Sequence, residues 1–242
     1  MTSVVISQPM LFPWPGFFEQ LMLADVYLFL DDVQFSRGSF TNRVQLRLGD
    51  RSIWMTIPLS GKGAFQNISD LREGSDDWRR VHFDQVRQSL RHASCLTDAL
   101  ALLETCYSHE RLVDLLVATI EVPAGYLGIG TGQRRMRTSQ MNIGGSGSSR
   151  VLELVKAVGG TRYITGHGAA RYLDHESFEV AGIEIVYMDY SLTPWARDDS
   201  QFTPYVSILD LVGYQGKDAV GHLRPRTVPW EQFVEMKLQT ER

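Results

Sequence analysis

One βαβ unit at the start of the chain constrains the fold more than any other feature. An apolar run from Val4 to Ile6 has the character of a buried strand, and it stops at a loop, Gln8 to Gly16, that contains three prolines. A helical stretch from Phe17 to Leu23 follows, and a second apolar run, Val26 to Leu30, ends in two adjacent aspartates. Ligands of open α/β sheets bind beyond the carboxyl ends of the strands, so this unit locates a site before it indicates a reaction.

A hairpin and a helical section come next. Residues 43–48 and 52–57 are β-prone on either side of a Gly-Asp-Arg turn and predict the hairpin. Residues 75–127 carry leucines at helical spacing; Asp76-Asp77 suits a helix N-terminus, and Pro123 is expected to end the last helix. We therefore predict a mainly helical middle section.

The final third returns to alternating helices and strands. The pattern predicts a helix, two strands and a last helix over residues 149–158, 161–165, 183–188 and 204–214. Such alternation at both ends of a chain favours a parallel sheet with right-handed connections. We predict one α/β domain over residues 1–242: a Rossmann-like, mainly parallel sheet flanked by helices, with the hairpin and the helical section of about 75–127.

Composition excludes several classes of protein. A net charge of −4 gives no general footprint for nucleic acid or an anionic membrane. No apolar run approaches the roughly 20 residues of a membrane span, and Pro9 and Pro13 interrupt any signal-peptide pattern. Cys95 and Cys106 are too far apart along one helix to bond, which is typical of free thiols in a reducing cytoplasm. We expect a cytoplasmic protein with no membrane partner and no metal site, because the histidines and cysteines lack metal-ligand spacing.

Polar residues follow the second predicted strand. Asp31 and Asp32 point to opposite sides of a regular strand, so only one of them is expected to face the crevice, as a base or as a group that orients the ligand. The pair alone supplies too few oxygens for a hard cation. Gln34, Asn42 and Arg43 follow as candidate substrate-binding residues. Arg43 either binds a carboxylate or phosphate of the ligand, or forms an ion pair with one of the aspartates that fixes the loop.

A second group of candidates follows the strand predicted over 161–165. His167 lies between two glycines, which let the backbone approach a ligand, and its imidazole suits a general base. The alternative is a histidine that is hydrogen-bonded within a turn. Arg171 and Tyr172 lie on the following turn and are expected to line the same crevice.

The proline loop and two further segments allow both structural and functional interpretations. Trp14 either caps the core or forms an aromatic wall beside exposed helix amides. Ser207 fits a helix cap and, at the same helix end, an anion ligand. The glycine-rich residues 144–150 are either a mobile linker or an anion-binding loop, and the basic run 134–137 is either a solvated surface or a docking site for a phosphorylated donor, a carrier protein or tRNA.

A set of short motifs, taken together, resembles the WbqC family. The segments are Gln8-Pro9, Phe12-Pro13-Trp14, Gly16-Phe17, Ala24-Asp25, Leu30–Phe35, Ser39-Phe40, Asn42-Arg43, Trp54–Pro58, Gly160–Gly166, Arg171–Asp174, Gly182-Ile183 and Phe202–Asp210. The match spans nearly the whole chain. The resemblance implies a setting in polysaccharide or natural-product biosynthesis, with transfer of an acyl or aminoacyl group to an amine as an attractive role.

The opening βαβ unit also resembles, more distantly, the nucleotidylyltransferase-type HUP folds. In those enzymes a His-x-Gly-His motif begins the first helix and stabilises the transferring phosphates. Placing Gly16 on the glycine of that motif puts Trp14 and Phe17 where the two histidines stand. Indole and phenyl rings cannot donate charge-assisted hydrogen bonds to a phosphoryl group, which disfavours adenylyl transfer.

We predict a biosynthetic transferase that moves an acyl or aminoacyl group to an amine of a small polar acceptor, such as an amino sugar or a natural-product intermediate. We expect the donor to be an activated acyl compound, either free or presented by a carrier protein or tRNA. Catalytic roles are assigned to His167 and Asp31, and substrate binding to Gln8, Trp14, Asp32, Gln34, Asn42, Arg43, Arg171, Tyr172 and Ser207. Two alternatives stay open: an ATP-dependent adenylylating ligase on a degenerate HUP scaffold, and a non-catalytic protein that binds a ligand or partner in glycan or natural-product biosynthesis.

Overall fold

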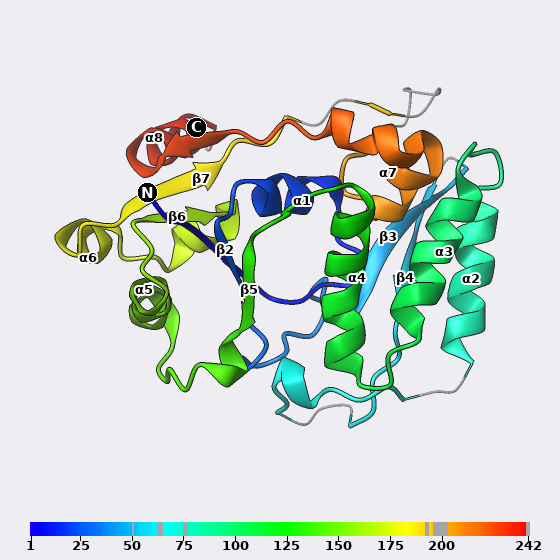
Figure 1. Cartoon of the computed structure of the whole chain (residues 1–242), viewed down its shortest axis with the longest axis horizontal. Coiled ribbons are helices and arrows are strands. Elements are labelled where there is room, and N and C mark those ends of the chain that lie inside the picture. The colour runs from blue at the N-terminus through cyan, green and yellow to red at the C-terminus, as the bar shows by residue number, and fades with distance from the viewer. Residues whose placement is uncertain (50, 62–64, 75–76, 192–193, 196–202, 241–242) are drawn as a thin grey trace.

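A six-stranded sheet forms the centre of the fold (Figure 1). The computed structural model describes residues 1–49, 51–61, 65–74, 77–191, 194–195 and 203–240. The strands lie in the order β5-β2-β1-β6-β7-β8. Their bounds are Ser3–Ser7 (β1), Val26–Phe29 (β2), Arg134–Arg137 (β5), Arg162–Thr165 (β6), Glu184–Met188 (β7) and Thr227–Pro229 (β8). All pair in parallel except β8, which is antiparallel to β7.

The order of the parallel strands is that of a doubly wound sheet. Counted along the chain, they read 3-2-1-4-5 across the sheet, which confirms the predicted Rossmann-like class. The helices are α1 (Pro15–Met22), α2 (Trp78–Ser89), α3 (Leu96–Tyr107), α4 (Leu112–Tyr126), α5 (Gly147–Ala157), α6 (His175–Val180), α7 (Ile208–Gln215) and α8 (Trp230–Thr240). Short 3₁₀ turns include Ile68–Asp70, Thr138–Gln140, His167–Arg171 and Gly216–His222.

Both faces of the sheet are buried, as the continuous apolar runs of its strands require. Val5 and Ile164 belong to one hydrophobic cluster, with residues of α1, α3, α4 and α7. Val4 and Tyr163, which alternate with them, belong to a second cluster with residues of α5 and α6. Figure 1 shows α5 and α6 on one side of the sheet and α1 and α4 on the other.

The predicted hairpin is also present, away from the central sheet. Strands β3 (Arg43–Leu48) and β4 (Arg51–Thr56) pair in antiparallel register, and Gly49 in the turn has a positive φ of 58°. The hairpin contacts the C-terminal part of the chain through a parallel bridge between Gln45 and Val206. It therefore packs beside the segment that leads into α7, with Arg43 at its first position.

Several predicted boundaries are wrong. Helix α1 begins at Pro15, a favourable first helical position for proline, and α4 continues past Pro123, which removes a backbone hydrogen bond only near the helix end. Helix α7 begins at Ile208 and not near residue 204, because Ser207 caps it. The basic run 134–137 is the edge strand β5, and no pattern predicted β8 or α8. Asp76 and Phe202 lie outside the described residues.

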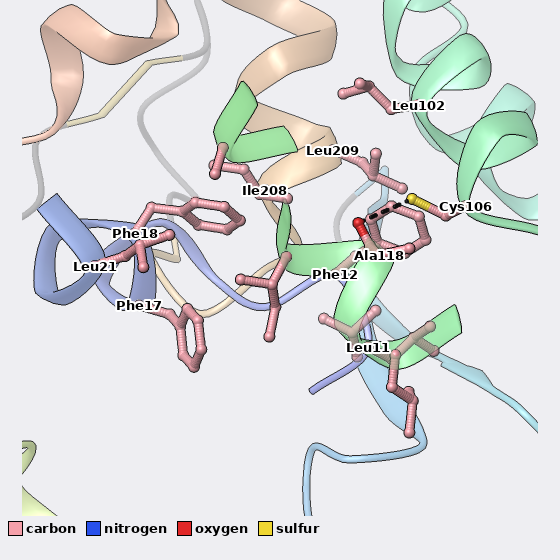
Figure 2. Close-up of a cluster of buried hydrophobic side chains, with 14 of the residues drawn as sticks. Leu11, Phe12, Phe17, Phe18, Leu21, Leu102, Cys106, Ala118, Ile208 and Leu209 are labelled. Atoms are coloured by element: carbon pink, nitrogen blue, oxygen red, sulfur yellow. Dashed lines mark hydrogen bonds between the residues drawn. The ribbon is translucent and has the colours of Figure 1, made fainter. Parts of the chain in front are cut away.

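The proline loop is fixed to the rest of the fold by buried side chains and by α7. Leu11 and Phe12 are fully buried, and Figure 2 shows them close to residues of α4 and α7. The hydroxyl of Ser207 donates to the Phe12 carbonyl at 3.0 Å, and the amide of Ile208 donates to the Pro13 carbonyl at 2.9 Å. Phe12 has a φ of 39°, uncommon for a non-glycine residue, and these contacts hold it there.

Candidate functional site

The fold creates a topological switch point between β1 and β6. From β1 the chain runs through α1 to β2, on one side of β1, whereas β6 leads through α6 to β7 on the other side. Helices α1 and α6 belong to opposite hydrophobic clusters, so the carboxyl ends of β1 and β6 border a crevice where doubly wound folds bind ligands.

A cavity of about 420 Å³ opens at this point, and we call it the switch-point cavity. It lies within the size range of small-molecule sites. Its lining is Ile6, Ser7, Gln8, Met10, Trp14, Phe17, Gln20, Leu30, Tyr163, Thr165, Gly166, Gly168, Ala169, Tyr172 and Tyr190. None of these side chains carries a formal charge at neutral pH. Gln8, Trp14 and Tyr172 thus lie where the sequence placed them, and their binding roles stay predictions.

Trp14 forms an aromatic wall of the switch-point cavity. It precedes the first residue of α1, and its ring contacts Tyr190 and Tyr205 with centroid separations of 4.7 Å and 5.5 Å. A Cβ atom on Gly16 would overlap the Trp14 ring, so the glycine allows the indole to lie against the helix. Tyr190 is half-buried, and the pKa of its phenol is raised, mainly by this burial and to a smaller extent by the nearby Glu19 carboxylate. The phenol is therefore a neutral hydrogen-bond donor in the physiological pH range.

His167 lies at the edge of this cavity with one ring nitrogen already engaged. Its Nε2 is 2.8 Å from the Met188 carbonyl, and because a carbonyl only accepts, Nε2 carries the proton. In the neutral ring, Nδ1 is then the basic nitrogen. The imidazole packs between Tyr190 and Phe233, at centroid separations of 5.1 Å and 4.8 Å. The side chain itself is not among the lining residues, although both flanking glycines are.

A second cavity of about 510 Å³ adjoins the first and shares Gln8, Leu30 and Tyr172 with it. We call it the clamp cavity because an ion pair closes one side. Arg150, only 8% exposed, donates from Nη2 to Asp32 at 2.6 Å and from Nε to the Ile143 carbonyl at 3.1 Å. The other Asp32 oxygen accepts from Thr138 at 2.6 Å. The clamp holds the glycine-rich loop, residues 144–147 before and within α5, against the end of β2.

Asp32, and not Asp31, lines the clamp cavity. Asp31 is 1% exposed, and its carboxylate accepts hydrogen bonds from the amide and hydroxyl of Ser139 at 3.0 Å and 2.8 Å. A weaker contact from Thr138 is 3.4 Å long. These bonds place the Asp31 carboxylate where it fixes the turn after β5, and it lines none of the cavities described here.

Gln34, Asn42 and Arg43 line a third cavity, of about 890 Å³, which we call the arginine cavity. Gln34 also lines the clamp cavity, so the two adjoin at the backbone bridge between Gln34 and Asn67. One of the two alternatives for Arg43, an ion pair with an aspartate after β2, is not formed. Asp32 pairs with Arg150, and the Cζ atom of Arg43 lies 4.2 Å from the ring centroid of Trp54 on the hairpin. Asp32, Gln34, Asn42 and Arg43 lie close together in the sequence, but in the fold they line two neighbouring cavities, the clamp cavity and the arginine cavity.

Two other predicted site residues lie outside these cavities. Ser207 is fully buried, and its hydroxyl also accepts from the amide of Leu209 at 3.2 Å, as a helix cap does. Asp210, three residues after Ser207, forms a buried ion pair with Arg47 at 3.0 Å. Arg171 is exposed and lines none of the three cavities.

Sequence reasoning missed Tyr190 and Arg150. Tyr190 lies two residues after the end of β7. The rule that ligands bind beyond the carboxyl ends of parallel strands, which indicated Asp31 and His167, could therefore have indicated Tyr190 as well. Arg150 lies 118 residues from its partner Asp32, and no local pattern connects them.

The described residues give no sign of a metal site or a membrane helix. No group of three or more His, Cys, Asp or Glu side chains in that part of the chain could hold a metal. Within the same residues, no helix has both the length and the apolar character needed to cross a bilayer. Cys95 and Cys106 are both free thiols, as predicted.

Comparison with known proteins places the chain in a family. The model of the WbqC-like protein family matches residues 8–222. The chain belongs to this family. It is also 28% identical over 232 residues to "Uncharacterized protein Rv1507c" of Mycobacterium tuberculosis (strain ATCC 25618 / H37Rv), a match that covers 93% of this chain and 98% of that protein. No solved structure matches the chain. The WbqC-like match includes Trp14, Asp32 and His167.

Proposed function

We propose that this WbqC-like protein is an enzyme that transfers an acyl or aminoacyl group to an amine of a small polar acceptor, such as an amino sugar or a natural-product intermediate. The observation that carries the proposal is the uncharged, aromatic lining of the switch-point cavity. An amine attacks an acyl carbonyl only as the free base, and desolvation lowers the pKa of an amine. A cavity whose described lining carries no charged side chain therefore favours the nucleophilic form of the acceptor.

His167 is the proposed base. The hydrogen bond from Nε2 to Met188 leaves Nδ1 as the proton acceptor. As the amine nitrogen bonds to the acyl carbon, its proton passes to Nδ1 and the bond to the leaving group breaks; the imidazolium then returns the proton to that group. Asp32 lines the clamp cavity whereas Asp31 lines none of the three cavities, so we assign the role of orienting the acceptor to Asp32 in place of Asp31. Holding the two substrates together supplies much of the rate enhancement.

The same lining argues against the adenylylating ligase. Transfer of a nucleotidyl group requires cationic donors around the phosphates, and the described lining of the switch-point cavity contains no Lys, Arg or His side chain. The basic strand β5 gives little support to a tRNA or carrier-protein donor, because Arg135 and Arg137 already lie 4.0 Å and 2.6 Å from the carboxylates of Glu121 and Asp114. A small activated acyl compound is the donor that we favour.

The test is direct detection of the amide product. The full chain is incubated with a panel of amino sugars and other small amines and with acyl-thioester and aminoacyl-tRNA donors, and the products are analysed by mass spectrometry. We expect amide formation by the wild type. The His167→Gln variant retains an amide group that can donate to Met188 but lacks a base, so its kcat should fall by about 10²–10⁴-fold.

His109→Gln is the matched control, because His109 is an exposed histidine between α3 and α4, remote in sequence from the site. It should leave kcat unchanged. Equal activities of wild type and His167→Gln would remove His167 from the mechanism. Pyrophosphate release from ATP and a carboxylic acid would instead support the ligase. Binding of an amine without any turnover across the panel would support a non-catalytic protein.

A further inference from the structure

The arginine cavity has the properties of a second ligand site. It lies between the segments 34–43 and 56–61, with Gln66, beside the hairpin, and its volume of about 890 Å³ is ample for a small molecule. Phe35, Ile57, Pro58 and Leu59 provide apolar surface, and the amide side chains of Gln34, Asn42 and Gln66 provide polar groups. Gln34 is shared with the clamp cavity, and the mechanism proposed above does not use Asn42, Arg43 or Gln66.

Arg43 is held in one orientation within this cavity. Its Nη2 donates to the carbonyl of Gly38, and the face of its guanidinium lies 4.2 Å from the Trp54 ring. Gly38 has a φ of 84°, and a Cβ atom there would lie 3.3 Å from Nη2, so glycine permits this contact. The Nε atom of Arg43 is buried and has no hydrogen-bond partner. A fixed guanidinium with an unused donor is preorganised to bind a carboxylate or phosphate.

The cavity also has an unbalanced charge. Arg37 and Arg43 line it, and its described lining contains no acidic side chain. In the part of the chain that the structure describes, neither arginine forms an ion pair, whereas Arg47 and Arg150 each have a carboxylate partner. Arg37 is exposed, but Arg43 is partly buried. A partly buried cation without a counter-ion is unfavourable, and an anionic ligand would compensate it.

We propose that the arginine cavity binds a small molecule through an anionic group, a phosphate or a carboxylate, that Arg43 and Arg37 hold while the apolar wall contacts the rest of the molecule. This site is separate from the switch-point cavity. Because the clamp cavity adjoins both, the bound molecule can be the acyl donor, and this last step rests on the proposed function.

The test uses two amphipathic anions that differ only in the anionic group. Phenyl phosphate and benzoate are titrated into the full-length chain labelled with ¹⁵N-arginine, with benzyl alcohol as the neutral control. The Arg43 Nε–Hε resonance is assigned by its loss in Arg43→Lys. We expect at least one anion to shift this resonance at a concentration of about 10 mM or below, and benzyl alcohol to leave it in place. A stronger shift by phenyl phosphate indicates a phosphorylated ligand, and the reverse indicates a carboxylate.

Variants separate the cavity from general charge effects. Arg43→Gln lacks the Arg43 resonance, so binding to the variants is followed through the Nε–Hε resonance of Arg37, which lines the same cavity. Arg43→Gln should weaken binding by at least about tenfold, the loss expected for a charge-assisted hydrogen bond. Arg51→Gln, an exposed arginine of the same hairpin outside the cavity, should weaken it by less than about twofold. The proposal is overturned if neither anion shifts the Arg43 resonance, or if the two variants weaken binding equally. These measurements need no acyl transfer, so the anion site and the proposed function can fail independently.

Discussion

Replacing Asp32 by asparagine tests the clamp that joins the end of β2 to the glycine-rich loop. The substitution keeps the shape of the side chain and leaves the Arg150 guanidinium without its carboxylate. Arg150 is 8% exposed and then retains only the Ile143 carbonyl among the partners described above. Breaking a buried ion pair costs about 3–5 kcal/mol. Because the Asp32 side chain is 25% exposed, water compensates part of the loss, and we expect about 2–3 kcal/mol.

The assay is urea unfolding followed by fluorescence, with Glu184→Gln as the matched control. Glu184 pairs with Arg162 at 2.9 Å, but both side chains are exposed by 32% or more, so this loss should stay below about 1 kcal/mol. A double-mutant cycle with Arg150→Met should return a coupling energy of roughly 1.5–3 kcal/mol. If Asp32→Asn costs no more than Glu184→Gln, the carboxylate does not hold the loop and the account of the clamp cavity is incorrect.

Three further predictions concern pH, packing and reactivity. Burial lowers the pKa of His82 to about 4 from 6.5, so the unfolded state binds a proton that the folded state does not, and stability should fall by roughly 3 kcal/mol from pH 6.5 to pH 4; urea unfolding of His82→Gln should lack this part of the pH dependence. Gly16→Ala should displace the Trp14 ring, seen as a change in near-ultraviolet circular dichroism, at a net cost of about 1 kcal/mol because lost ring contacts are partly offset by the helix propensity of alanine. Burial raises the pKa of the Cys106 thiol to about 12, so a thiol reagent at pH 8 should modify it only on unfolding; rapid reaction in the folded state would contradict its placement.

The fold was predictable where the signals are local. The apolar runs of β1, β2, β6 and β7, the turn of the hairpin and the capping serine before α7 all lie within a few residues of the structure that they specify. Strand β5 was missed because three of its four residues are arginines. Hydrogen bonds with β2 and the carboxylates of Asp114 and Glu121 on α4 stabilise an arginine-rich strand at this position. These partners lie outside the few residues from which a strand is predicted.

The site was predictable to the level of the sheet edge and no further. Trp14 and the glycines around His167 follow the carboxyl ends of parallel strands, and they line a cavity there. Doubly wound sheets bind ligands at this edge, so the location of the cavity could be predicted. Of the two alternatives for Arg43, the ion pair with an aspartate after β2 is excluded, since Asp32 pairs with Arg150 and the Arg43 guanidinium lies over the Trp54 ring. Binding of an anionic ligand by Arg43 stays a prediction. The partner of Asp32 comes from α5. Contacts between segments so far apart in the chain depend on tertiary packing, which sequence spacing does not specify.

The most direct test of the central claim is a crystal structure of the protein soaked with the amine that the transfer assay identifies as acceptor. We expect electron density for the amine in the switch-point cavity, in contact with Trp14, Tyr172 and Tyr190. Its nitrogen should lie within hydrogen-bond reach of His167 Nδ1, directly or through one water. An amine bound in the arginine cavity or elsewhere on the surface, with the switch-point cavity unchanged, would contradict it.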